Sequence, residues 1–187
     1  MSTAPLEVHR WSRPEYEQMV RQGLLGPEDR VELIDGIISD MSPQDSPHAT
    51  GVTLCQEAVR PVCPPGSFLR VQMPLALTED SMPEPDLAVV PGSPLDYSRS
   101  HPTTALLVIE VAGSSPHRDR GPKKDLYARV GIPEYWLLDL AAEALEVYRD
   151  PVQGRYRSRE VLYAGDIVSP LFGPQAAIEV AGLFPLD

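Results

Sequence analysis

The sequence of 187 residues contains no asparagine, only two cysteines and only two lysines. Cys55 and Cys63 stand eight positions apart with no histidine at ligand spacing, which argues against a zinc site. No stretch approaches the roughly 18 apolar residues of a membrane span. The first residues carry charge and lack the apolar core of an export signal. We therefore expect a cytoplasmic protein with reduced thiols and no membrane partner.

Basic residues are also fewer than acidic ones. The sequence has 16 Lys and Arg and 27 Asp and Glu, which gives a formal net charge of −11. Such a chain does not bind nucleic acid over its whole surface. Positive charge is instead concentrated in residues 118–129 and 149–159, each with a local net charge of +3. Two readings stay open: these stretches are solvated faces, or they form a local patch that meets a negatively charged partner.

Lysine occurs only at positions 123 and 124, and the other 14 basic residues are arginine. The lack of asparagine and the 21 prolines fit a thermophile, although a GC-rich genome produces a similar bias toward arginine. In either case lysine is replaced nearly everywhere. The one place that keeps it therefore requires a chemical reason.

Local patterns predict a single mixed α/β domain over residues 1–187, with more strands than helices. Ser12 and Glu15 form a capping box that begins a helix over 12–22. Asp35-Gly36 between two apolar runs predicts a two-residue hairpin. Two further helices are expected over 46–60 and 119–130, and strands over 68–77, 86–90, 105–112, 134–140, 144–150 and 155–163. The tail, 167–187, has no clear period.

Two carboxylates stand beside apolar strands. Glu110 interrupts the run ALLVIEVA (105–112), and a buried carboxylate is costly unless it is paired, protonated or bound to a metal. The alternative is a strand-end glutamate whose head reaches solvent. Asp86 follows Pro83-Glu84-Pro85, whose prolines fix the direction of the chain. Alone it is an ordinary turn aspartate, but on neighbouring strands the two carboxylates could hold one hard divalent cation.

The two lysines lie in the third predicted helix. Residues four apart share a helix face, so Lys123 aligns with Tyr127, and Asp125 and Arg129 should point outward. Two solvated helix lysines are the alternative reading. Arginine serves equally well for surface charge, but it does not serve where a compact ammonium must meet a metal-bound water.

Four blocks of sequence, taken in order, resemble the Uma2 family, also known as DUF820. They read VELIDGIISDMSP, PEPDLAVV, LLVIEVAGSS and KKDLYARVGIPEYWLLD. The resemblance runs from about Ser12 to Val147, and the last block is its most specific part. The family is similar in fold to type II restriction endonucleases, the PD-(D/E)xK superfamily. The resemblance thus implies an α/β (α+β) fold of the restriction endonuclease type, with a central mixed sheet of four or five strands flanked by helices and extra antiparallel strands.

The resemblance also implies metal ligands. Pro85-Asp86 matches the "PD" element, and Glu110 matches the acidic residue of "(D/E)xK". Both would bind Mg²⁺ or Mn²⁺, with the backbone carbonyl of Val111 as a third ligand. The two carboxylates must then lie on the same side of the sheet.

One position departs from the superfamily pattern, because Ala112 stands where its lysine is expected. In the Uma2 pattern the lysine comes from the following helix, four residues before Tyr-Ala. That position is Lys123, and Lys124 is the alternative if the register shifts by one. Glu32 and His48 fall where the family has an acidic residue and a histidine, as accessory residues.

The activity implied is that of a metal-dependent endonuclease, a homodimer that hydrolyses phosphodiester bonds of nucleic acid, DNA in particular. The basic residues beside the site would face the nucleic-acid backbone; they are Arg118, Arg120, Lys124 and Arg129. Two alternatives stay open. Ala112 would fit a catalytically weak or inactive module for DNA binding or assembly. The acidic net charge would fit a metal-dependent hydrolase of smaller phosphate esters.

Overall fold

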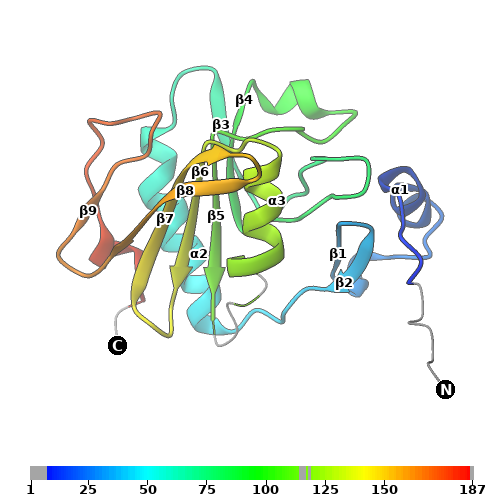
Figure 1. Ribbon diagram of the computed structural model, residues 1–187, viewed down its shortest axis with the longest axis horizontal. Coiled ribbons are helices and arrows are strands. Elements are labelled where there is room, and N and C mark those ends of the chain that lie inside the picture. Colours follow the sequence, from blue (N-terminus) through cyan, green and yellow to red (C-terminus); the bar gives the residue numbers. More distant parts are fainter. Residues whose placement is uncertain (1–7, 114–116, 118, 186–187) are drawn as a thin grey trace.

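A six-stranded mixed sheet forms the centre of the computed structural model, which describes residues 8–113, 117 and 119–185 (Figure 1). Its strand order is β3-β4-β5-β6-β7-β8. Only β5 and β6 run parallel, and the other pairs are antiparallel. The bounds are β3 Ser67–Val71, β4 Leu87–Pro91, β5 Leu107–Ala112, β6 Glu134–Asp139, β7 Ala144–Val152 and β8 Arg155–Leu162. The sheet is mixed as expected, and its six strands agree with a predicted core of four or five strands with extra antiparallel strands.

The remaining elements surround this sheet. The helices are α1 (Arg13–Arg21), α2 (Ser46–Val59) and α3 (Lys124–Arg129), the last preceded by a π-helical turn over Asp119–Lys123. Two small antiparallel ribbons pair β1 (Val31–Ile34) with β2 (Ile37–Asp40) and β9 (Ile167–Val168) with β10 (Ile178–Glu179). Short 3₁₀ turns span Pro27–Asp29, Arg60–Val62, Pro94–Tyr97 and Val180–Leu183. In the part of the chain that the structure describes, none of the helices has the length and apolar character of a membrane-spanning segment.

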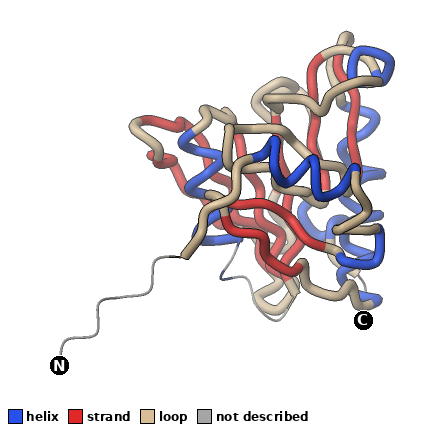
Figure 2. The backbone as a smooth tube through the Cα atoms, turned by 90° about the vertical axis from the view of Figure 1, so that its right-hand side faces the viewer, coloured by secondary structure: helices blue, strands red, loops and turns tan. Residues whose placement is uncertain are grey.

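The sheet is covered on both faces (Figures 1 and 2). On one face Val52, Cys55 and Val59 of α2 pack against alternate residues of the central strands. On the other face Tyr127 of α3 joins a cluster that contains Tyr135. Every residue of β5 and β6 is buried, which explains their nearly continuous apolar sequences.

Most local predictions are confirmed. Helix α1 begins with the capping box of Ser12 and Glu15. The β1–β2 hairpin turns at Asp35 and Gly36, which have φ values of 49° and 74°. Positive φ at both central residues is typical of the type I′ turn that Asp-Gly favours. A side chain at position 36 would also meet Arg10, because its Cβ would stand 2.9 Å from the Cβ of that arginine.

Two local predictions differ from the structure, one in the length of a strand and one in the type of helix. The strand expected over 68–77 ends at Val71, because Gln72 adopts a φ of 49° and Pro74 lacks an N–H for a sheet hydrogen bond. The helix expected over 119–130 begins as a π-helix that contains Gly121 and Pro122, and becomes α-helical only at Lys124.

The tail covers the α2 side of the sheet. Leu183 is fully buried in that core, and Phe172 and Phe184 pack against it, whereas Leu171 is exposed. Most of the apolar residues of the tail are therefore used within one chain.

Candidate active site

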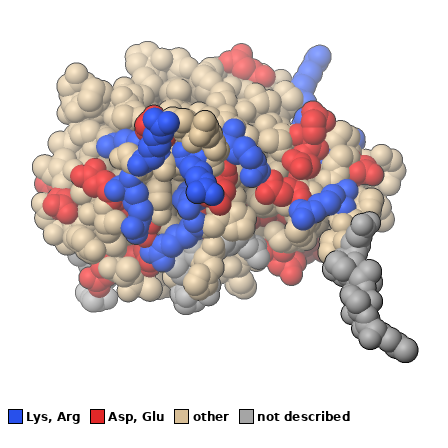
Figure 3. All heavy atoms as spheres, viewed as in Figure 1, with Lys and Arg blue, Asp and Glu red and all other residues tan. Residues whose placement is uncertain are grey.

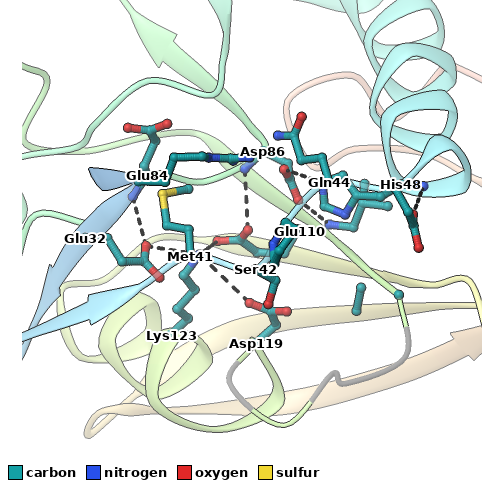
Figure 4. Close-up of a pocket in the computed structure, with 16 residues that line it drawn as sticks. Glu32, Met41, Ser42, Gln44, His48, Glu84, Asp86, Glu110, Asp119 and Lys123 are labelled. Carbon is teal, nitrogen blue, oxygen red and sulfur yellow. Dashed lines mark hydrogen bonds and ion pairs between the residues drawn. The ribbon is translucent and has the colours of Figure 1, made fainter. Parts of the chain in front are cut away.

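A pocket of about 270 Å³ brings together acidic residues from distant parts of the sequence (Figure 4). They come from β1, the loop before α2, the segment before β4, the strand β5 and the π-helical turn. The pocket is lined by six acidic residues, Glu32, Asp45, Glu84, Asp86, Glu110 and Asp119, together with Arg30, His48, Lys123 and the segment 41–44. All the residues predicted as metal ligands or accessory groups, except Lys124, lie here.

The pairing of β4 with β5 places Asp86 beside Glu110. Leu87 is the register partner of Ile109, so the residue before β4 meets the middle of β5. The N–H of Val111 donates to Asp86 Oδ2 at 2.8 Å, and the N–H of Asp86 donates to Glu110 Oε2 at 3.4 Å. The two carboxylates therefore share one side and one pocket, as predicted.

Glu110 is buried, and the alternative of a strand-end glutamate that reaches solvent is wrong. Its Oε1 accepts hydrogen bonds from Tyr127 Oη at 2.7 Å and from Lys123 Nζ at 3.0 Å. Burial raises the pKa of Glu110 well above its ordinary value; Lys123 opposes this shift, and Asp119, Asp86 and Glu32 add to it. Burial also raises the pKa of Tyr127, so its hydroxyl keeps the proton that it donates.

Lys123 is a buried ammonium with 5% of its surface exposed. Its Nζ lies 3.0 Å from Glu110 Oε1, 3.2 Å from Glu32 Oε2 and 3.9 Å from Asp119 Oδ1. Burial alone would lower the pKa of Lys123, but the charges of these carboxylates outweigh it and the pKa is raised. The reading of Lys123 as a solvated helix lysine is therefore wrong.

Lys124 lies outside the pocket. Its Nζ lies 3.4 Å from Asp125 Oδ1 and 5.7 Å from the centre of the Tyr148 ring. Asp125 and Arg129 are exposed, as the helical spacing predicted. Lys123, and not Lys124, is therefore the lysine that lies in the pocket.

The π-helical turn that presents Lys123 is anchored to the sheet at its first residues. Tyr135 Oη donates to the carbonyl of Asp119 at 3.1 Å. The guanidinium of Arg120 pairs with Asp139 and with Glu146, two buried carboxylates of β6 and β7. Gly121 and Pro122 are unfavourable in a helix. The contacts of Asp119 and Arg120 with the sheet stabilise the turn in spite of them.

The basic residues predicted to face nucleic acid are mostly paired with carboxylates. Arg120 pairs with Asp139 and Glu146, Lys124 with Asp125, and Arg129 with Asp35. Arg118 lies outside the described residues. Lys and Arg side chains nevertheless gather on the face over β8 and α3 (Figure 3), where Arg155 and Arg157 are exposed.

His48, whose role the sequence left open, contacts Asp86 directly. His48 Nε2 lies 3.0 Å from Asp86 Oδ1, and Gln72 Nε2 donates to the same oxygen at 3.2 Å. The first turn of α2 holds His48 in place, since Asp45 caps that helix and accepts the N–H of His48 at 2.9 Å.

The His48–Asp86 pair shifts both pKa values. The hydrogen bond that His48 donates to Asp86 raises the pKa of His48 against the effect of burial. Burial would raise the pKa of Asp86, but the hydrogen bond and charge of His48, with the Val111 N–H and Lys123, hold it below its ordinary value. Around neutral pH Asp86 is therefore a carboxylate held by fixed donors.

These shifts predict a window of pH in which the pair stabilises the fold. The stabilisation from His48 is complete below its ordinary pKa of 6.5 and is lost as pH rises through the raised value. That from Asp86 is complete above its ordinary pKa of 3.8 and is lost as pH falls through the lowered value. We expect His48→Gln to cost about 1–2 kcal/mol of unfolding free energy at pH 5.5 and less at pH 9. Urea unfolding of both proteins at the two pH values measures this, and an equal cost at both would contradict it.

Several residues of the site were missed by the sequence interpretation, among them Glu84, Asp119 and Gln72. The N–H of Glu84 donates to Glu32 Oε2 at 3.1 Å, and the carboxylate of Glu84 stands two positions before Asp86. Asp119 stands four positions before Lys123, a helical spacing that could have revealed it. Gln72 follows β3 and had no local signal, because its contact with Asp86 depends on the pairing of β3 with β4.

The donor set fits a hard cation that needs few protein ligands. No group of three or more His, Cys, Asp or Glu residues in the described chain is arranged to hold a metal ion by itself. Mg²⁺ is usually held by one or two carboxylates, with water and substrate phosphate completing its shell. Asp86 Oδ2 and Glu110 Oε2 each accept one backbone hydrogen bond, the second a long one, so both retain acceptor capacity. These two carboxylates could therefore hold one hard cation together with water and substrate oxygens, an open arrangement unlike the closed cage of a structural zinc site.

Comparisons with known proteins show the fold and the family of the chain. The structure is similar to a crystal structure described as a putative nuclease belonging to DUF820 from Anabaena variabilis, with a TM-score of 0.71 over 88% of this chain and 94% of that chain. The sequence identity is 20%, so this likeness shows the fold alone. No curated protein matches the chain. The model of the Uma2 family, described as "Putative restriction endonuclease", matches residues 13–181, and the chain therefore belongs to the Uma2 family.

Proposed function

We propose that this chain is a metal-dependent endonuclease that hydrolyses phosphodiester bonds, with DNA as its substrate. The observation that carries the proposal is the position of Lys123, whose Nζ lies 3.0 Å from Glu110 Oε1 in the pocket that Asp86 also lines. The three residue types of a PD-(D/E)xK site thus meet in one pocket, although the lysine comes from a helix and Ala112 occupies its usual place in the sequence.

The proposed ligands of Mg²⁺ or Mn²⁺ are the carboxylates of Asp86 and Glu110, with the backbone carbonyl of Val111. The bound cation would supply the positive charge that makes water more acidic and stabilises charge on the phosphate group. The protein fixes both carboxylates in advance. Asp86 is held by His48, Gln72 and the Val111 N–H, and Glu110 by Tyr127 and Lys123. Such supporting hydrogen bonds orient ligands before the metal or the substrate arrives.

Lys123 would contribute a second positive charge beside the phosphate. Its ammonium carries three donors, and the carboxylates around it keep it protonated. Because the pocket is lined by six acidic residues, it repels a phosphate group until cations offset this charge. The proposal therefore predicts a strict need for a divalent cation. Each chain carries one such site, and a dimer would present one site to each strand of a duplex, so we propose that the active form is a homodimer.

Nicking of supercoiled plasmid in Mg²⁺ or Mn²⁺ tests the proposal. Wild type should nick the plasmid, and EDTA should abolish the reaction. Asp86→Asn should lower the rate by at least ~10²–10³-fold, as expected when one preorganised charge of an active site is removed. The matched control is Asp125→Asn, which changes an exposed carboxylate of the neighbouring helix and should cleave like wild type.

Three outcomes would contradict the proposal in different ways. Cleavage that survives in EDTA or in Asp86→Asn would exclude this metal site. Metal-dependent binding of DNA without cleavage would indicate a binding module. Rapid hydrolysis of small phosphodiesters with an intact plasmid would indicate a hydrolase of smaller esters. Single-stranded RNA, assayed in parallel, distinguishes the class of nucleic acid.

A further inference from the structure

A second pocket, of about 500 Å³, lies between α1 and the segment 97–103. It is separate from the acidic pocket, because the two pockets have no lining residue in common. Its lining is rich in hydrogen-bond donors, among them Arg13, Arg21, Arg99 and His101. The proposed nuclease activity makes no use of this pocket.

Behind the pocket lies a buried arginine with poor partners. Arg70 of β3 has 8% of its surface exposed, and its Nε has no hydrogen-bond partner. Its Nη2 makes two long contacts, 3.4 Å to the carbonyl of Pro74 and 3.3 Å to His101 Nδ1. Among the described residues no carboxylate forms an ion pair with Arg70. A buried cation without a counter-charge is costly and calls for an anion.

His101 connects this arginine to the pocket. Because Nδ1 faces a guanidinium donor, it must act as an acceptor, which places the ring proton on Nε2. Burial and the charge of Arg70 lower the pKa of His101, so the ring is neutral at pH 7. Nε2 has no hydrogen-bond partner in the described part of the chain, although His101 lines the pocket. Its N–H can therefore donate to a ligand in the pocket.

The charges around the pocket are unbalanced. Glu17, the carboxylate in its lining, lies 3.1 Å from Arg13 Nη1 and 3.6 Å from Arg21 Nη1. Arg13 also pairs with Glu79. Arg99 has no ion-pair partner among the described residues, and neither has Arg70. The pocket thus has an excess of positive charge in a chain of net charge −11.

We propose that this pocket binds a phosphate group through Arg99, His101 and the charge of Arg70. A phosphate has several acceptor oxygens and negative charge, which match guanidinium and imidazole donors. Two sources present this chemistry: a free or terminal phosphate, and a phosphodiester of a nucleic-acid backbone. The proposal does not depend on the nuclease activity, since the pocket shares no lining residue with the acidic one.

Titration calorimetry of the full chain with inorganic phosphate tests the proposal, in EDTA and at constant ionic strength. Wild type should bind phosphate saturably, and its melting temperature should rise in phosphate relative to chloride. Arg70→Met should weaken binding at least tenfold and should not lower the melting temperature in chloride, because it removes an unpaired buried charge. Arg60→Met, which removes an exposed arginine directly after α2 and outside both pockets, is the matched control and should bind within twofold of wild type.

Further variants keep the test decisive if Arg70→Met does not fold. Arg99→Ala and His101→Gln change residues that are not fully buried, and each should weaken phosphate binding at least threefold. The proposal fails if wild type does not bind phosphate saturably, if these variants bind like wild type, or if Arg60→Met weakens binding equally.

Short oligonucleotides identify the source of the phosphate. A 5′-phosphorylated trinucleotide that competes with inorganic phosphate, where its 5′-hydroxyl counterpart does not, supports a terminal or free phosphate. Equal competition by both supports a backbone phosphodiester. Competition by neither, with inorganic phosphate still bound, restricts the site to free phosphate. Because these measurements contain no divalent cation, they succeed or fail independently of DNA cleavage.

Discussion

Lys123→Arg is expected to lower the turnover of DNA by ~10²–10³-fold while DNA binding stays close to that of wild type. The substitution keeps the positive charge, but the arginine side chain needs more space than the lysine side chain. Nζ fits between Glu110 Oε1 and Glu32 Oε2 at 3.0 and 3.2 Å, in a position that is 5% exposed. A planar guanidinium is wider than an ammonium and prefers to bind a carboxylate with two parallel hydrogen bonds. We expect it to displace Glu110 from the position in which it would meet the cation.

Plasmid nicking under saturating DNA measures the turnover, and fluorescence anisotropy of a labelled duplex measures binding. Lys124→Arg is the matched control, since Lys124 contacts Asp125 and the Tyr148 ring outside the pocket. It should be nearly silent. A loss in Lys124→Arg with none in Lys123→Arg would assign the role to the neighbouring lysine. Full activity in both variants would remove lysine from the reaction.

Lys123→Met is expected to cost about 3–5 kcal/mol of unfolding free energy at pH 8, because removing one partner of a buried ion pair leaves an uncompensated charge. Glu110 and Glu32 are both almost fully buried and would lose their ammonium. The pKa of Glu110, already raised by burial, should rise further.

The sign of the pH dependence follows from that raised pKa. A carboxyl group whose pKa is raised in the folded state destabilises the fold increasingly as pH rises from its ordinary value through the raised one. Lys123→Met should therefore be closer to wild type at pH 5 than at pH 8. Urea unfolding in EDTA at both values measures this. Lys124→Met, the control, should stay within about 0.5 kcal/mol of wild type. A cost for Lys123→Met that is small at pH 8, or larger at pH 5, would contradict the burial of this charge.

Local structure and the identity of the chemical groups could be predicted from the order of residues alone. The capping box at Ser12 and the Asp-Gly turn depend on hydrogen bonds and backbone angles of only a few neighbouring residues. The helix and the hairpin that they begin or connect could therefore be predicted. Glu110 could be singled out because a carboxylate in an apolar strand needs a partner. Lys123 could be singled out because lysine is otherwise absent, apart from its neighbour.

Which of these groups meet depends on how the chain packs. The antiparallel pairing of β4 with β5 brings Asp86 to Val111, and strand register depends on contacts across the whole sheet. The same holds for Gln72, for the π-helical turn held by Arg120, and for the contact of Lys123 with Glu32 from the first hairpin. No local pattern marked Arg70 as a buried cation, because its neighbour His101 comes from a loop 31 residues away. Burial and charge pairing depend on such long-range contacts, which local patterns do not encode.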